Sequence, residues 1–87
     1  MKIRGRITLE IAMKTIEDCQ VAISSLLPDE RELPQGLTST IKCIDDKLTY
    51  ELTYHVDNEK LLSVYNTIDD FIRNLKIIME SLSELRR

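Results

Sequence analysis

Residues 47–72 read KLTYELTYHVDNEKLLSVYNTIDDFI, and the spacing of their apolar residues changes near Asp57. Before Asp57 every second residue is apolar, which is typical of a strand with one buried face. The alternating apolar positions are Leu48, Tyr50, Leu52, Tyr54 and Val56. After Asp57 or Asn58, either of which can cap a helix, apolar residues recur at steps of three and four. The sequence therefore predicts a strand that runs directly into an amphipathic helix.

The final helix is predicted to begin at about residue 57 and to continue to the end of the sequence. Its main apolar stripe is formed by Leu61, Tyr65, Ile68, Ile72, Leu75, Met79 and Leu82. A second row beside this stripe is formed by Val64, Phe71, Ile78 and Leu85. A helix of roughly 28 residues is ~42 Å long, whereas a strand of about nine residues spans ~30 Å. We therefore expect the helix to extend past its own sheet and to expose an apolar patch that another chain covers.

The residues before the quoted strand predict a first strand and a first helix. Residues 2–11 alternate polar and apolar side chains, as a half-buried strand does. Gly5 lies on the apolar side of this strand and indicates either a close approach of a helix or a bulge. Thr15 can cap a helix of apolar periodicity, which Pro28 is expected to close before a loop.

A further strand completes the predicted order of elements. Residues 37–43 alternate as a strand, and the polar residues 45–47 connect it to the quoted strand as a hairpin turn. The order is then strand, helix, strand, strand, helix (β-α-β-β-α). We predict an α+β fold with a three-stranded antiparallel sheet and two helices packed on one face. With only two Gly and two Pro in 87 residues, residues 1–87 are predicted to form a single domain.

The charge balance and the absence of targeting signals narrow the class of protein. Twelve Lys and Arg against 15 Asp and Glu give a net charge of −3, the wrong sign for a protein whose main ligand is a phosphate backbone. No apolar run approaches the roughly 20 residues that span a bilayer, and no signal-peptide core is visible. We therefore expect a cytoplasmic protein with no membrane partner, in which Cys19 and Cys43 are buried, reduced thiols. A disulfide would require an oxidising compartment.

Candidate catalytic and metal-binding residues are few. His55 is the only histidine and lies on the polar face of its strand, without a nucleophile or an acid in a recognisable arrangement. The two cysteines point away from it, so the three or four ligands of a metal site are not assembled. We therefore predict no enzyme activity, no catalytic residue, no metal and no cofactor. Lys2, Arg4 and Arg6 form a basic stripe on the exposed face of the first strand, which leaves a direct RNA contact as a weaker alternative.

Three short motifs resemble a known family. They are LLPD at residues 26–29, LPQGL at residues 33–37 and SVYNTIDDFIR at residues 63–73. These motifs and the order of elements are similar to those of the small dimerisation subunit of the KEOPS complex, a family related to the cancer/testis antigens. The last helix departs from the family pattern at Tyr65 and at the acidic pair 69–70.

The resemblance implies a non-catalytic scaffold. Members of the family dimerise and bind the sugar-kinase-like ATPase subunit that installs threonylcarbamoyl on adenosine in tRNA. We therefore expect a homodimer, or a heterodimer with a paralogue, that binds this ATPase (transferase) subunit and meets tRNA only indirectly or weakly. A small RNA-binding α+β module is the alternative from another class. The predicted partner-binding residues are Leu61, Tyr65, Ile68, Asp69, Phe71, Ile72, Arg73 and Leu75. Asp69 and Arg73 are expected to form an ion pair at the rim of the interface.

Overall fold

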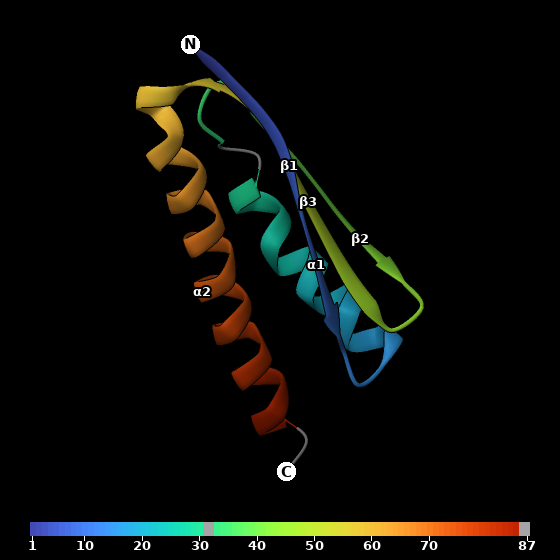
Figure 1. The fold of residues 1–87 in the computed structure, drawn as a ribbon. Coiled ribbons are helices and arrows are strands. Elements are labelled where there is room, and N and C mark those ends of the chain that lie inside the picture. The colour runs from blue at the N-terminus through green and yellow to red at the C-terminus, as the bar shows by residue number, and fades with distance from the viewer. Residues whose placement is uncertain (31–32, 86–87) are drawn as a thin grey trace.

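The computed structural model describes residues 1–30 and 33–85, which contain three strands and two α-helices (Figure 1). The elements in chain order are β1 (Lys2–Ala12), α1 (Ile16–Glu30), β2 (Leu37–Ile44), β3 (Lys47–Asp57), a 3-10 turn η1 (Asn58–Lys60) and α2 (Leu61–Leu85). Both helices cover the same face of the antiparallel sheet. The predicted fold class and the predicted order of elements are confirmed, although α1 continues two residues past its predicted end at Pro28.

The central strand of the sheet is β3, because the strand order is β1-β3-β2. β3 pairs with β1 along all 11 residues of β1 without interruption. This regular ladder excludes the bulge that was considered at Gly5. Gly5 lies opposite Tyr54 instead, and the Tyr54 ring occupies the position that a Cβ atom at Gly5 would take. A neighbouring side chain, and not a close helix backbone, therefore accounts for this glycine.

The hydrophobic core lies between the sheet and the two helices. The ring of Tyr50 on β3 stacks on the ring of Phe71 on α2, with ring centroids 3.8 Å apart and ring planes 13° from parallel. Thr67 is also buried, and its hydroxyl donates a 2.8 Å hydrogen bond to the carbonyl oxygen of Ser63, so its burial leaves no unpaired polar atom. The other buried core residues are Met13, Cys19, Ala22, Leu26, Leu37, Leu48, Leu52, Val56, Val64 and Leu75.

The protein is elongated, and α2 is nearly matched in length by the sheet. The Cα radius of gyration is 14.0 Å, against about 12 Å expected for a compact chain of this length. β1 and β3 contain 11 residues each and span ~36 Å, whereas the 25 residues of α2 span ~38 Å. The predicted large overhang of α2 is wrong, because the strands are longer than the sequence indicated. Neither helix of the described ranges is long and apolar enough to cross a membrane.

The turn between β2 and β3 contains only Asp45 and Asp46, and Asp45 has a φ of 57°. This left-handed conformation is tolerated by Asp but costs a β-branched residue more. We expect Asp45→Val to lower the free energy of unfolding by about 1–2 kcal/mol, measured by urea denaturation. Asp46→Val is the control, because Asp46 is also exposed in the same turn but has no positive φ. An equal loss in both variants would show that backbone strain is not the cause.

Candidate interaction surface

One side of α2 carries large apolar side chains that the protomer leaves uncovered. Tyr65 is 68% exposed, Ile72 49% and Met79 38%. Ile68 lies among them and is partly buried. At about 100° per residue, these side chains fall within a sector of roughly 60° around the helix axis. We call this set, Tyr65, Ile68, Ile72 and Met79, the α2 flank.

The neighbouring sector of α2 faces the core. Phe71 is 1% exposed and Leu75 is 7% exposed, so the structure corrects the expectation that both side chains face a partner. The apolar side of α2 is wide, and packing on β3 buries the sector centred on Phe71 instead of the one centred on Ile72. Both residues therefore hold α2 on the sheet.

The other predicted partner-binding residues lie at the surface or at its edge. Leu61 is half-buried at the start of α2. Asp69 and Arg73 form an ion pair, with 2.9 Å between Arg73 Nε and Asp69 Oδ2, and both side chains remain more than half exposed. Such an exposed pair adds little to the stability of the fold. Its two charges therefore remain available for contacts at the rim of the α2 flank. Met79 was omitted from the predicted set, although its place in the same apolar stripe was a usable signal.

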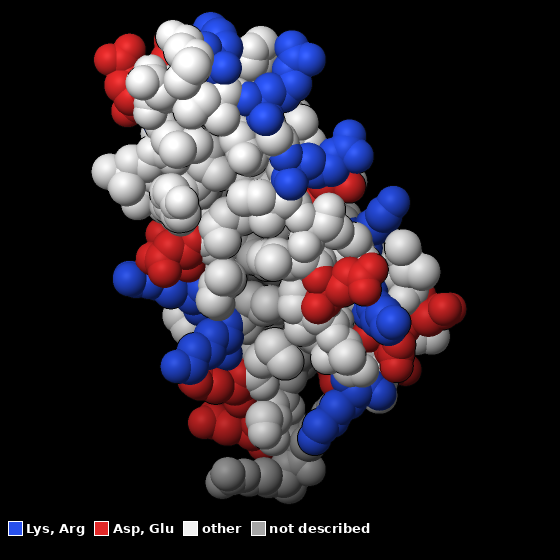
Figure 2. Space-filling model, viewed as in Figure 1, with Lys and Arg blue, Asp and Glu red and all other residues white. Residues whose placement is uncertain are grey.

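The α2 flank borders a face of β1 that is incompletely covered. α1 packs against β2 and β3, and the apolar side chains Ile3, Ile7 and Ile11 of β1 are only partly buried. Figure 2 shows an uncharged band that runs down the molecule between the charged side chains of α2 and those of the sheet. A shallow groove on the α2 side of this band includes Ile72 and Met79. β1 and α2 together therefore present one continuous apolar strip.

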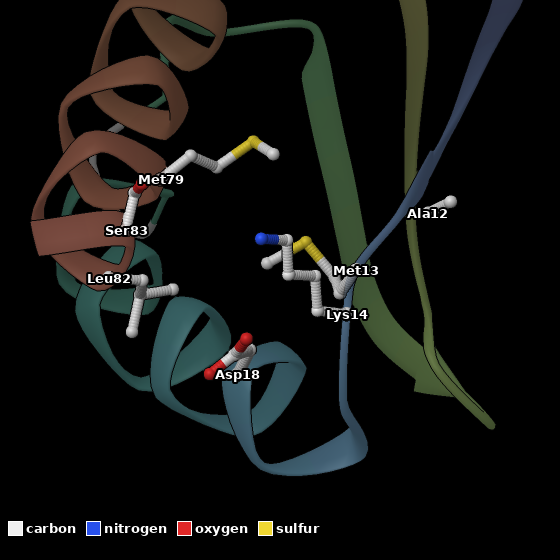
Figure 3. Close-up of a pocket in the computed structure, with 7 residues that line it drawn as sticks. All are labelled: Ala12, Met13, Lys14, Asp18, Met79, Leu82 and Ser83. Carbon is white, nitrogen blue, oxygen red and sulfur yellow. The ribbon is translucent and has the colours of Figure 1, made fainter. Parts of the chain in front are cut away.

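A cavity of about 250 Å³ lies at one end of this strip, between the end of β1 and the last turns of α2 (Figure 3). The side chains of Met13 and Met79 extend into it from opposite walls, and Lys14 directs its ammonium group toward α2. The lining residues are Ala12, Met13, Lys14, Asp18, Met79, Leu82 and Ser83. Two thioethers and a leucine make this lining suited to the burial of an apolar side chain.

The open face of the sheet carries the remaining candidate residues. His55 is exposed on this face. Lys2 Nζ lies 3.7 Å from Asp57 Oδ2, and Arg6 Nε lies 3.7 Å from Glu51 Oε1, so acids of β3 offset part of the predicted basic stripe. Within residues 1–30 and 33–85, no group of three or more His, Cys, Asp or Glu side chains is placed to hold a metal ion.

The prediction of two reduced cysteines is wrong. Cys19 on α1 and Cys43 on β2 form a disulfide, and their Cα atoms are 6.1 Å apart. Both residues occupy apolar positions of their elements, and the packing of α1 on β2 brings these positions together across 24 residues of sequence. The disulfide therefore ties α1 to the edge of the sheet that lies farthest from β1.

The match to a known protein family covers nearly all of this fold. A family model described as "transcription factor Pcc1" matches residues 6–83, from within β1 to the last turns of α2. No curated protein matches the chain. The matched range includes the α2 flank, the groove beside it and most of β1. The chain belongs to the Pcc1 family, the family of small subunits of the KEOPS complex.

Proposed function

We propose that this chain is the non-catalytic dimerisation and scaffold subunit of a KEOPS complex. In this role it binds the sugar-kinase-like ATPase subunit that makes threonylcarbamoyladenosine in tRNA. It works in the cytoplasm through protein–protein contacts, without a cofactor, and meets tRNA through the assembled complex. Beside family membership, the observation that carries the proposal is the exposed α2 flank next to the partly covered face of β1. Contiguous apolar surface of this kind marks interaction sites in small proteins.

The exposed residues of α2 have distinct roles in the proposed interface. Tyr65 and Ile72 are its central anchors, because large side chains that lose their water on binding contribute most of the affinity. Asp69 and Arg73 lie at the rim, where charged pairs influence orientation more than affinity. Phe71 supports the interface from behind by fixing α2 on β3.

A substitution on the α2 flank tests the dimerisation part of the proposal. We expect Ile72→Lys to weaken self-association by about 2 kcal/mol, because it places a charge in a surface that must be desolvated. The melting temperature of the isolated protein, measured at low concentration, is expected to change little, because Ile72 is 49% exposed. Sedimentation equilibrium measures the dissociation constant.

Ile77→Lys is the matched control, because Ile77 is 62% exposed on α2 and lies well outside the α2 flank. We expect the control to dimerise as the wild type does. Equal weakening by both substitutions would show a general effect of charge on α2 and would exclude the flank as the dimer surface. If the wild-type chain is monomeric alone but pairs with a paralogue, the dimer is a heterodimer and not a homodimer.

Binding of the ATPase subunit is tested separately, by light scattering of the wild-type protein mixed with the ATPase subunit of the same organism. We expect the mass to rise by at least one ATPase subunit per dimer. A dimer whose mass does not change would contradict the scaffold role.

A further inference from the structure

The cavity between the end of β1 and the last turns of α2 carries chemistry that the proposed scaffold role does not use (Figure 3). Its volume of about 250 Å³ corresponds to roughly eight water molecules at liquid density. A small organic molecule with about that number of non-hydrogen atoms would fill it. The walls come from β1, α1 and α2, so the tertiary fold is what assembles this cavity.

The apolar part of the cavity is formed by Met13, Met79 and Leu82. Met13 is 7% exposed and Met79 is 38% exposed, and their side chains extend into the cavity from opposite walls. Methionine is unbranched and its thioether is polarisable, so two methionines adjust well around an aliphatic group. This part of the lining is therefore suited to a short aliphatic chain, whose burial is favourable.

Two opposite charges line the same cavity. Lys14 directs its ammonium group across the cavity toward α2, and Asp18 lies on the wall formed by α1. Lys14 forms no ion pair with any residue that the structure describes, so the two charges share one cavity without being paired to each other. A carboxylate has about four acceptor positions, so Asp18 can accept from a ligand in addition to its contacts within the chain. The lining therefore offers a cationic donor and an anionic acceptor, with no net charge.

The backbone on both sides of these charges is held in place. The N–H of Met13 donates to the carbonyl oxygen of Asp46 at 2.8 Å, which ties the residue before Lys14 to the sheet. The N–H of Asp18 donates to the hydroxyl oxygen of Thr15 at 3.1 Å, so Thr15 caps α1 and Asp18 is its third residue. The positions from which the two charged side chains start are therefore fixed before a ligand arrives.

We propose that this cavity binds a free α-amino acid with an aliphatic or thioether side chain. The ligand carboxylate pairs with the ammonium group of Lys14, and the ligand ammonium group pairs with the carboxylate of Asp18. The ligand side chain packs on the two methionines and the leucine of the apolar part. The inference goes beyond the scaffold function and does not depend on it.

Related ligands leave part of this lining unsatisfied. An aliphatic carboxylate brings a negative charge toward Asp18 with nothing to offset it, and an aliphatic amine does the same with a positive charge toward Lys14. Glycine satisfies both charges but leaves the apolar part without a partner. A residue within a polypeptide has neither free charge, so the structure favours a free amino acid over a segment of a partner protein.

The three methionines of the chain provide probes for a binding experiment. Met13 and Met79 line the cavity, whereas Met1 precedes the opposite end of β1 and is 84% exposed. The full chain, with ¹³C-labelled methionine methyl groups, is titrated with L-leucine and followed by NMR. We expect the Met13 and Met79 signals to shift saturably with a dissociation constant of about 1 mM, as suits so small a ligand. The Met1 signal should not move.

Three analogues of leucine test the parts of the ligand separately. They are isocaproate, which lacks the amino group, isoamylamine, which lacks the carboxylate, and glycine, which lacks the side chain. We expect isocaproate and isoamylamine to bind about fivefold more weakly than leucine, the upper range for one exposed ion pair. We expect glycine to bind at least tenfold more weakly, because it loses the apolar contacts.

Substitutions of the two charged residues are expected to act in opposite directions on different ligands. Lys14→Gln should weaken leucine binding about fivefold, and Lys14→Arg, which keeps the charge, should restore it. Asp18→Asn should weaken leucine binding by a similar factor but strengthen isocaproate binding, because it removes the charge that repels that ligand. Lys47→Gln is the matched control, because Lys47 lies opposite Ala12 in the β1–β3 register but does not line the cavity. It should bind leucine as the wild type does.

The outcomes distinguish the ligand from the site. If isocaproate bound as tightly as leucine, or if Asp18→Asn strengthened leucine binding, the amino-acid ligand would be overturned. If leucine moved none of the methyl signals, or moved all three alike, the site itself would be overturned. Neither result would change the scaffold function, which sedimentation and light scattering test independently.

Discussion

Phe71→Ala is expected to lower the free energy of unfolding by about 3 kcal/mol or more, the usual cost of removing a buried aromatic ring from a core. The Phe71 ring is 1% exposed and stacks on Tyr50, which is 0% exposed on the central strand. The cavity that the ring leaves would be lined by apolar side chains, so a water molecule would not compensate for the lost contacts. Since domains of this size have only about 5–15 kcal/mol of stability in total, the variant should be partly unfolded at moderate temperature. Urea denaturation followed by circular dichroism measures the loss.

Tyr65→Ala is the control, because Tyr65 is the other aromatic residue of α2 and is 68% exposed. We expect it to change the stability of the monomer by less than about 0.5 kcal/mol while weakening self-association. Both proteins are compared at several concentrations, since dimerisation adds to apparent stability. If Phe71→Ala weakened binding and left unfolding unchanged, Phe71 would be a partner contact, as the sequence alone predicted.

Phe71 was predicted to face a partner and is buried in the core, and this difference shows where sequence periodicity stops being informative. Alternation along β3 correctly predicted which side of the strand is buried, because a strand has only two faces. On α2 the two apolar rows share one broad side of the helix, and spacing cannot tell which row lies innermost. That choice depends on how α2 is tilted against β3 and α1, which is a long-range property. The buried Thr67 adds to the ambiguity, because its bond to Ser63 lets a polar residue occupy a core position.

Other differences have the same origin in contacts between distant segments. Gly5 indicated a missing side chain, but only the pairing of β1 with β3 reveals that Tyr54 fills the space. Cys19 and Cys43 were both predicted to point inward, yet nothing in the neighbouring sequence shows that the packing of α1 on β2 brings the two cysteines together. The α2 flank could be predicted in outline, since an apolar side too wide for one sheet must cover something else.

Loss of the disulfide is expected to have the second large effect. The double variant C19A/C43A should lose about 3 kcal/mol of unfolding free energy, because cross-linking a loop of this length restricts the unfolded chain by that amount in the chain-entropy model. The two cysteines are 24 residues apart and join different layers of the fold. The same loss is expected on adding reductant to the wild type, and C19A/C43A should not respond to reductant.

Because of the position of this disulfide, its removal is expected to lower stability without changing dimerisation. The disulfide fixes α1 on β2, whereas the proposed surface lies on the α2 flank and the neighbouring face of β1, at the opposite edge of the sheet. We therefore expect reduced wild type and C19A/C43A to unfold at lower urea concentration but to dimerise with an unchanged dissociation constant while folded. If the dimer of C19A/C43A weakened in proportion to the loss of unfolding free energy, α1 and α2 would behave as one cooperative unit. The dimer surface would then depend on the α1–β2 contact. If reductant left the unfolding free energy of the wild type unchanged, the two cysteines would not be joined in solution, and the original expectation of buried thiols would be restored.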